Sequence, residues 1–310
     1  MGAQTAFVFR HLPLALAQQL DFFVPEGLDV AVQAFASDAL ALQAMHEGAA
    51  DVCAIDFEQI LRHAHSGAAP GQCFVVQGRA AQVALGVSMR ALPRFKELAD
   101  LRGHQVGVSA LGTQSHTVAC LALGQAGVVP DAVSFVAVGE GERAREALRS
   151  GRVQALCHGD PLMTLLEHNG DVRIMGDART LTGGQALFGG SVPGGCLVAP
   201  AAFLQKRAAD AQALSNGIVH ALKWLQTAGP ADLVRALPAS SLGKDRSLYL
   251  SAFARARETL SPDGMMPING AATALRALAL AEPEVGLSRR DLARTFTLEF
   301  AQKSKLKFSA

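Results

Sequence analysis

The chain has 310 residues, which is longer than one hydrophobic core usually supports, so we expect two packed units. Half of the residues are hydrophobic, 18% are charged and the formal net charge is +1, a balance typical of folded globular proteins. Acidic and basic residues are mixed along the chain, which argues against a nucleic-acid-binding face and a polybasic membrane anchor. No apolar stretch reaches the roughly 20 residues needed to span a bilayer.

The five cysteines are scattered, and no two have the CxxC spacing of a zinc or redox motif. Four of them lie in short apolar runs, so we expect buried free thiols, while a disulfide between distant cysteines stays open. We therefore predict no metal site and no cofactor. The start, Met1-Gly2-Ala3, lacks the basic and apolar segments of a secretory signal, which leaves a cytoplasmic protein or one whose signal has been removed.

Short apolar runs typical of strands alternate with segments of helical spacing along the first 200 residues. The predicted strands are 5–9, 28–35, 52–55, 73–77, 83–87, 105–109, 134–138, 153–157, 172–175 and, after a glycine-rich stretch, 197–199. The predicted helices are 13–23, 39–47, 115–125, 142–149, 161–168, 211–226, 231–237, 248–259, 270–280 and 289–300. This alternation favours mainly parallel sheets covered by helices, with ligands beyond the carboxyl ends of the strands.

Five segments carry a resemblance to a known family, in that family's order along the chain. They are LPLALAQQLDFFVPEGLDV at 12–30, ALQAMHEGAADV at 41–52, ELADLRGHQVGVSALGTQSH at 97–116, EALRSGRVQALCHGDP at 146–161 and DARTLTGGQALFGGSVPGGCL at 177–197. Together they resemble the periplasmic binding proteins of the nitrate, taurine and alkanesulfonate importers. That group also includes binders of pyrimidine precursors.

The resemblance implies an α/β protein with a periplasmic-binding-protein type II-like fold, in which a hinge joins two α/β lobes around a cleft. Lobe I would take residues 1–87 and 193–310, including a helical C-terminal portion, and lobe II would take residues 88–192. The crossings would lie near residues 86–88 and 194–197. It also implies a periplasmic protein that has lost its signal peptide, docks on an ABC permease in the inner membrane and acts as a monomer.

Candidate ligand contacts follow the predicted strands. The loop at Arg10 and His11 would present backbone amides and a helix dipole to a polar ligand group. Small residues at 112–116 would let a ligand approach the backbone of a helix start. The resemblance places the loop at Arg10 and the loop at His158 at the cleft. The predicted ligand-binding residues are Arg10, His11, Ser37, Asp38, Asp56, Gly112, Thr113, Gln114, Ser115, His116, His158, Asp160, Arg179 and Gly190.

Several of these residues also have a structural explanation. Ser37 and Asp38 are ordinary helix N-caps, and Asp56 either caps a helix or faces the cleft. Asp160 followed by Pro161 is a common start of a helix. Arg179 has the fork geometry that pairs with a carboxylate or sulfonate, but it is equally suited to an interlobe salt bridge.

The function expected from the resemblance is capture of a small organic anion, a sulfonate or carboxylate, by closure of the lobes, without catalysis. Binding of a pyrimidine or thiamine precursor is the alternative on the same fold. Two kinds of enzyme are similar to this family in fold. The aryl-sulfinate desulfinases carry a cysteine in the loop after the first strand, whereas the corresponding loop here, residues 10–13, has no thiol. The yeast pyrimidine synthase has a cysteine cluster, whereas the cysteines here are dispersed.

Overall fold

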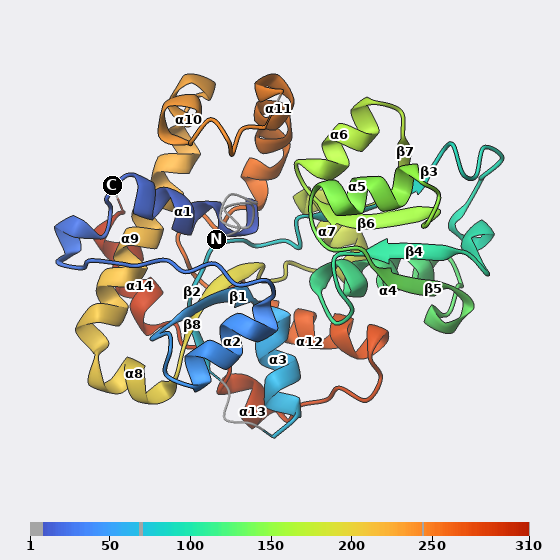
Figure 1. The fold of residues 1–310 in the computed structure, drawn as a ribbon. Coiled ribbons are helices and arrows are strands. Elements are labelled where there is room, and N and C mark those ends of the chain that lie inside the picture. The colour runs from blue at the N-terminus through green and yellow to red at the C-terminus, as the bar shows by residue number, and fades with distance from the viewer. Residues whose placement is uncertain (1–8, 68–70, 244, 310) are drawn as a thin grey trace.

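Two α/β units lie side by side in the computed structural model, which describes residues 9–67, 71–243 and 245–309 (Figure 1). We call the unit around a three-stranded sheet the first lobe and the unit around a five-stranded sheet the second lobe. The N-terminal and C-terminal segments both belong to the first lobe. The expected two-lobed, mixed α/β architecture is therefore present.

The three-stranded sheet has the order β1-β8-β2. Its middle strand β8 (Gly195–Ala199) runs antiparallel to β1 (Cys53–Asp56) and to β2 (Gln72–Val76). The helices of this lobe are α1 (Leu12–Gln19), α2 (Asp38–His46), α3 (Phe57–His65), α8 (Ala201–Lys206), α9 (Ala208–Thr227) and α14 (Glu299–Lys307). The buried strands and the long helix α9 enclose one apolar cluster that includes Phe74 and Leu222.

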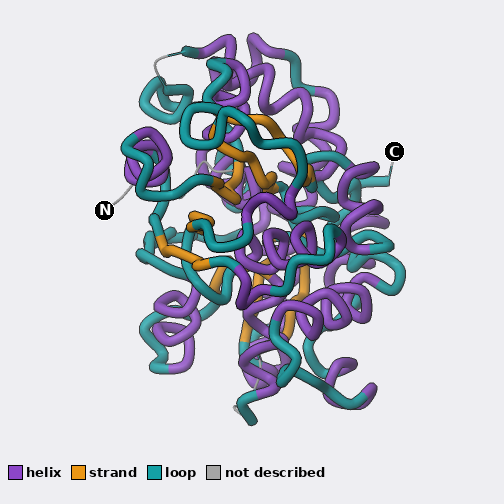
Figure 2. Tube along the Cα trace, turned by 90° about the vertical axis from the view of Figure 1, so that its right-hand side faces the viewer, coloured by secondary structure: helices purple, strands orange, loops and turns teal. Residues whose placement is uncertain are grey.

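The five-stranded sheet has the order β5-β4-β6-β3-β7. Its strands are β3 (Val83–Ser88), β4 (Gln105–Val108), β5 (Ser134–Ala137), β6 (Ala155–Gly159) and β7 (Val172–Asp177). The helices of this lobe are α4 (Gln114–Gln125), α5 (Glu142–Arg149), α6 (Leu162–His168) and α7 (Leu181–Phe188). Figure 2 shows helices and loops around the strands of both sheets.

The expectation of mainly parallel sheets is wrong. Among the described strands, β4 runs parallel to β5 and β6, and every other pairing is antiparallel. The reason is that β3 and β8 each enter their sheet from the opposite lobe. No helix stands between β2 and β3, because these consecutive strands belong to different sheets and need no parallel crossover.

Other element predictions also differ from the structure. Residues 28–35 form no strand with any described residue, and the strand predicted at 5–9 lies outside the described residues except for Phe9, which is in a 3-10 helix. The glycine-rich stretch contains the end of α7, whose N-cap Thr180 accepts a hydrogen bond from the Gly183 amide. The single helix predicted at 289–300 is two helices, α13 (Arg289–Ala293) and α14.

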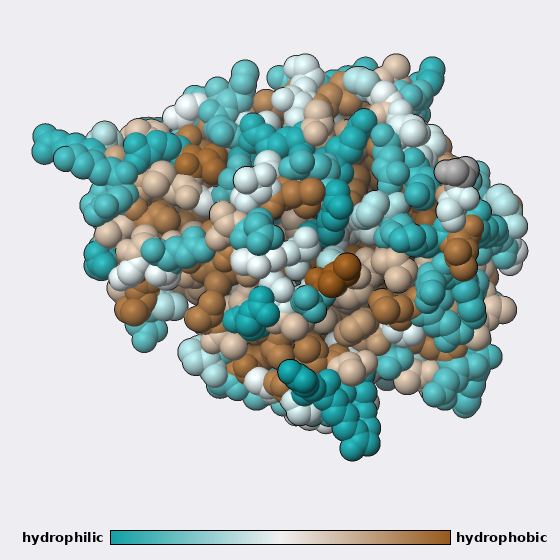
Figure 3. Space-filling model, turned by 180° about the vertical axis from the view of Figure 1, so that it is seen from behind, coloured by the Kyte–Doolittle hydropathy of each residue, from teal (hydrophilic) through white to brown (hydrophobic). Residues whose placement is uncertain are grey.

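Three further helices, α10 (Pro230–Ala236), α11 (Arg246–Ala256) and α12 (Gly270–Ala281), complete the fold. Helix α12 packs on α3 of the first lobe and on α4 and α7 of the second, so one apolar cluster continues through both lobes. None of the described helices combines the length and the apolar character needed to cross a membrane. On the face opposite to Figure 1, hydrophobic side chains gather in the middle and lower part among hydrophilic ones (Figure 3).

Candidate functional site

A small pocket lies between the lobes, where β1, β4, β5 and β6 end. About 50 Å³ of it is open to the centres of water-sized molecules. It therefore lies beyond the carboxyl ends of strands, as expected for α/β proteins. Its lining residues are Phe9, Arg10, Asp56, Ala81, Gln82, Val83, Ser109, Thr113, Gln114, Ser115, Glu140, His158, Gly159 and Asp160.

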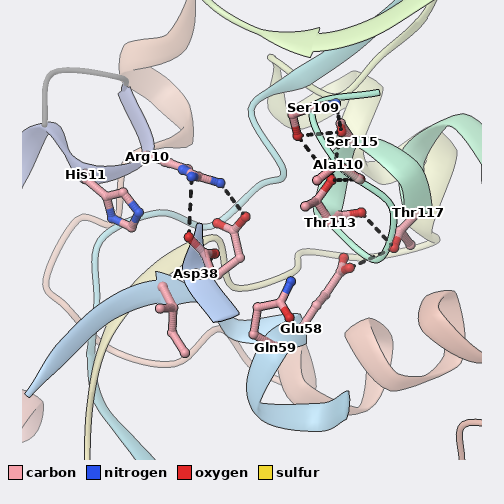
Figure 4. A network of polar contacts seen from close by, with 12 residues as sticks. Arg10, His11, Asp38, Glu58, Gln59, Ser109, Ala110, Thr113, Ser115 and Thr117 are labelled. Carbon is pink, nitrogen blue, oxygen red and sulfur yellow. Dashed lines mark hydrogen bonds and ion pairs between the residues drawn. The ribbon is translucent and has the colours of Figure 1, made fainter. Parts of the chain in front are cut away.

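Arg10 links two acidic residues on the first-lobe side of the pocket (Figure 4). Its guanidinium donates to Asp56 over 2.8 Å and to Asp38 over 3.5 Å, and Asp38 also accepts from the backbone amide of Asp56. The absence of a side chain at Gly195 permits this arrangement, because a Cβ there would lie 2.4 Å from the Arg10 carbonyl oxygen. The short 3-10 helix that carries Arg10 is thus held directly against β8.

Burial perturbs both groups that flank Arg10. Burial raises the pKa of Asp56 to about 7; the Arg10 charge opposes this rise, and Asp38 and Glu58 add to it. Burial and the Arg10 charge together lower the pKa of His11 to about 3. The neutral His11 ring lies with Nδ1 3.4 Å from the Nε2 atom of buried Gln77, so His11 supports the loop from behind the pocket.

Three hydroxyl groups form a closed cluster on the second-lobe side. Ser109 Oγ lies 3.1 Å from Thr113 Oγ1 and 2.9 Å from Ser115 Oγ, and the latter two are 2.9 Å apart. Gly112 allows the loop to turn back, because its φ of +67° is in the left-handed region that favours glycine. The cluster therefore presents hydroxyls at the start of α4, as the sequence predicts for Thr113 and Ser115.

Several pocket-lining side chains keep buried polar atoms without a hydrogen-bond partner among the described residues. They are Asp56 Oδ1, Gln82 Oε1, Gln114 Nε2, His158 Nε2 and Asp160 Oδ2. Buried polar groups in folded proteins are normally hydrogen-bonded, so these atoms are available to water or to a ligand in the pocket. Gln82 also has a φ of +56°, a sparsely populated conformation for a residue other than glycine.

His158 and Glu140 form an ion pair at the wall of the pocket. His158 Nε2 lies 3.0 Å from Glu140 Oε2, without the alignment of a good hydrogen bond. Burial would lower the pKa of His158, but Glu140 and nearby backbone groups raise it above its ordinary value. Burial likewise opposes ionisation of Glu140, but His158 lowers the pKa of Glu140 to about 2. The pairing therefore favours the charged form of both side chains.

Arg179 is fully engaged behind the pocket. Its guanidinium donates to Asp177 from two nitrogens over 2.8 and 2.7 Å, and also to Glu167, Thr164 and Asp160. These bonds use all five N–H groups of the side chain. Asp160 also accepts from the Thr164 amide over 2.8 Å, which leaves its Oδ2 facing the pocket region without a partner.

The structure brings part of the predicted site together. Arg10, Asp56, Thr113, Gln114, Ser115, His158 and Asp160 line the pocket, whereas His11, Ser37, Asp38, Gly112, His116, Arg179 and Gly190 do not. Ser37 caps α2, and His116 packs edge-on against Phe135. Gly190 lies next to Thr273 of α12.

The sequence analysis missed Gln82, Ser109 and Glu140 among the polar lining residues. Ser109 is the last residue of the predicted strand 105–109, and Glu140 lies two residues after the predicted strand 134–138, so both carry the signal shared by Asp56 and His158. Among the described residues, no group of three or more His, Cys, Asp and Glu side chains is arranged to hold a metal ion.

Comparisons with solved structures identify relatives of the whole chain, although no curated protein sequence matches it. A protein of Bordetella bronchiseptica RB50 is 40% identical, with a TM-score of 0.91 over 98% of this chain and 96% of that one. The periplasmic aliphatic sulphonate binding protein SsuA of Escherichia coli is 20% identical, with a TM-score of 0.68 over 92% of both chains.

An enzyme shares the fold too: a mutant of DszB, solved with biphenyl-2-sulfinic acid, is 16% identical with a TM-score of 0.63 over 97% of this chain and 96% of that one. The two more distant likenesses establish the periplasmic-binding-protein fold and not a ligand. The sequence model of the NMT1/THI5-like family matches residues 8–187, which is more than half of the chain. This chain therefore belongs to the NMT1/THI5-like family.

Proposed function

We propose that this chain is the solute-binding component of an ABC importer and works in the periplasm, where its small ligand occupies the pocket between the lobes. One observation carries the proposal: unpartnered buried polar atoms from both lobes line the same interlobe pocket. A ligand that satisfies atoms of both lobes at once favours the closed arrangement of the lobes. The resemblance to importer proteins, and the fold shared with SsuA, support the same function.

The lining favours a ligand that donates hydrogen bonds. Asp56 Oδ1, Gln82 Oε1 and Asp160 Oδ2 are acceptors, whereas Gln114 Nε2 is a donor; the fifth atom, His158 Nε2, faces Glu140 in the ion pair. Two carboxylates, those of Asp38 and Asp56, also share the single Arg10 guanidinium, whereas Glu140 is paired with His158. We therefore propose an amine or an N–H-bearing heterocycle, such as an aminopyrimidine, in preference to the organic anion expected from the sequence.

A small organic anion remains the second candidate because Arg10 lines the pocket. Its side chain is 25% exposed, and its two bonds to carboxylates leave further N–H groups for a sulfonate or carboxylate. An anion bound to Arg10 would, however, lie near the carboxylates of Asp38 and Asp56, which already share this guanidinium.

We propose that the hinge lies in the two segments that join the sheets. Residues 77–82 connect β2 to β3, and residues 189–194 connect α7 to β8. The boundary expected at residues 87 and 88 falls within β3, which pairs with β6 and β7 in the second sheet. Gln82 and Ala81 belong to the first connection and line the pocket, so a hinge there is sensitive to the ligand.

We propose binding without catalysis. A desulfinase-like reaction requires a reactive thiolate, which needs a lowered pKa and access to substrate. All five cysteines are buried and free, and none belongs to the pocket lining. Burial raises the pKa of Cys53 and of Cys120 to about 12, which opposes formation of a thiolate.

A thermal-shift screen tests the ligand class. The panel contains aliphatic amines, aminopyrimidines, taurine, alkanesulfonates and carboxylates, and each compound is recovered afterwards and analysed by mass spectrometry. A ligand at about 100 times its dissociation constant adds roughly 2.7 kcal/mol of stability. We expect stabilisation by an amine or aminopyrimidine that is recovered unchanged. Stabilisation by sulfonates alone would select the second candidate, and a chemically altered compound would contradict the binding function.

A further inference from the structure

We propose that Glu58, Gln59 and Arg62 of α3 are positioning residues that hold the pocket loop of the second lobe, residues 109–117, in its ligand-competent shape. We call their contacts with Gly112 and Thr117 the α3–α4 clasp. The inference rests on the proposed binding function, since it assigns a role to residues that do not line the pocket.

The clasp joins the two lobes through short hydrogen bonds. Gln59 Nε2 donates to the Gly112 carbonyl oxygen over 2.7 Å. One turn further into α4, Thr117 Oγ1 donates to Glu58 Oε2, also over 2.7 Å. Figure 4 shows Glu58 and Gln59 reaching from α3 towards the loop that carries Ser109, Thr113 and Ser115. The clasp therefore holds the loop from the opposite lobe at Gly112, within the hydroxyl cluster, and at Thr117, just after it.

Arg62 connects the clasp to α12. Its Nη2 donates to Thr117 Oγ1 over 3.2 Å and lies 3.4 Å from Glu58 Oε2. The same guanidinium donates to both carboxylate oxygens of Glu282, at the end of α12, over distances of 2.9 to 3.2 Å. Arg62 is thereby held from three helices, and its position fixes the side chains of Glu58 and Thr117.

Burial makes these contacts sensitive to the separation of the lobes. Glu58 and Thr117 are 1% and 0% exposed, so their hydrogen bond is shielded from water. Within its own lobe the loop is held by its hydroxyl cluster, by the bond from Thr113 Oγ1 to the Ala110 carbonyl oxygen and by a 3.4 Å contact of the Gly112 amide with His116 Nδ1. The Gln59 bond adds a contact to the Gly112 carbonyl oxygen from the opposite lobe. Loss of the clasp should therefore loosen the loop before it loosens the fold.

Hydrogen–deuterium exchange on the ligand-free full chain tests the proposal with Gln59→Ala and Thr117→Val. Matched controls are Gln43→Ala and Thr227→Val, which make the same changes at exposed positions of α2 and α9. We expect amides of residues 109–117 to exchange about two- to tenfold faster in the clasp variants, as for loss of one net hydrogen bond. Thr117→Ser keeps the hydroxyl and should restore the wild-type rate.

Two results would overturn the proposal: loop exchange equal to that of the control variants, or faster exchange spread over the whole chain. The second result would make the clasp a general stabilising contact. Because the measurement needs no ligand, its outcome is independent of the thermal-shift screen. The clasp can thus fail while the binding function stands, and the reverse is also possible.

Discussion

Asp56 is the residue whose charge state most affects the candidate site. Its side chain is 1% exposed and has one charged partner, Arg10, while its second oxygen has none among the described residues. Burial raises the pKa of Asp56 to about 7, so ionisation of Asp56 opposes folding over part of the physiological range. A ligand donor placed at the free oxygen would relieve this unfavourable burial.

The pH dependence of stability should therefore change in Asp56→Asn. A carboxyl whose folded pKa of about 7 exceeds its unfolded value of 3.8 stabilises the fold below about pH 4 and loses this contribution as pH rises to 7. Urea unfolding from pH 4 to 8 should show the wild type losing stability relative to Asp56→Asn as pH rises. If the difference in stability between the two proteins stays constant across that range, the pKa of Asp56 is not raised. Glu299→Gln is the control for the loss of an exposed charge.

Arg179 should act on stability more than on ligand contact. Arg179→Met removes the guanidinium that pairs with Asp160, which is 5% exposed, and with Asp177. The two carboxylates then lack a cation, and an unbalanced buried charge lowers the free energy of unfolding by about 3 kcal/mol or more. Urea unfolding should show this loss. A variant that keeps wild-type stability but loses ligand binding would instead indicate that Arg179 contacts the ligand directly.

At this scale the sequence predicts candidate positions better than roles. Asp56 and His158 could be found because each comes directly after a predicted strand, and Ser115 because it begins a predicted helix. The hydrogen bonds made by every donor of Arg179 could not be predicted from the sequence, because its partners depend on how α6 and β7 pack. The orientation of Gln82 depends on a positive φ that no local pattern indicates.

Strand β8 determines where the Arg10 loop can lie. Gly195, its first residue, allows the loop to approach the sheet, since an added Cβ would lie 2.4 Å from the Arg10 carbonyl oxygen and 3.1 Å from the His11 ring. Backbone atoms cannot move aside as easily as side-chain ends. The position of one side of the pocket therefore depends on a single glycine in a strand.

Gly195→Ala should displace the Arg10 loop and destabilise the protein by about 1–3 kcal/mol, as overpacking does in other cores. Gly124→Ala is the matched control, because no atom lies within 4 Å of the added methyl group in helix α4. That control should be neutral or more stable by about 0.5 kcal/mol. Urea unfolding of both variants checks this, and equal stabilities would contradict the role given to Gly195.

Most elements were predictable from their apolar runs and caps, such as α2 with its N-cap Ser37. The direction of the strands in each sheet was not predictable. The sequences of β3 and β8 resemble those of the other strands, but these two strands enter their sheets from the opposite lobe. Helix α7 was hidden by its glycines, which disfavour a helix unless tertiary contacts compensate. The sheet assignment thus depends on long-range pairing that one sequence does not show.

At the scale of the whole molecule, the pocket lies between two lobes, and the chain passes between these lobes twice. Helix α12 and the α3–α4 clasp connect the lobes on one side. On another side, Arg255 of α11 donates to Glu167 of α6 over 2.7 Å. A ligand that adds contacts to both lobes would reinforce the arrangement that these interlobe contacts already favour.

The central claim is that a small solute binds to both lobes at once in this pocket. Thermal-shift titration with 4-aminopyrimidine tests it most directly, and ethanesulfonate serves as the anionic comparison. The proteins titrated are the wild type, Asp56→Asn in the first lobe and Gln114→Leu in the second lobe. We predict that a ligand stabilises the wild type. Either substitution should lower the apparent affinity for that ligand at least tenfold, which is about 1.4 kcal/mol. Stabilisation by either compound that survives both substitutions, or that depends on one lobe alone, would contradict the account.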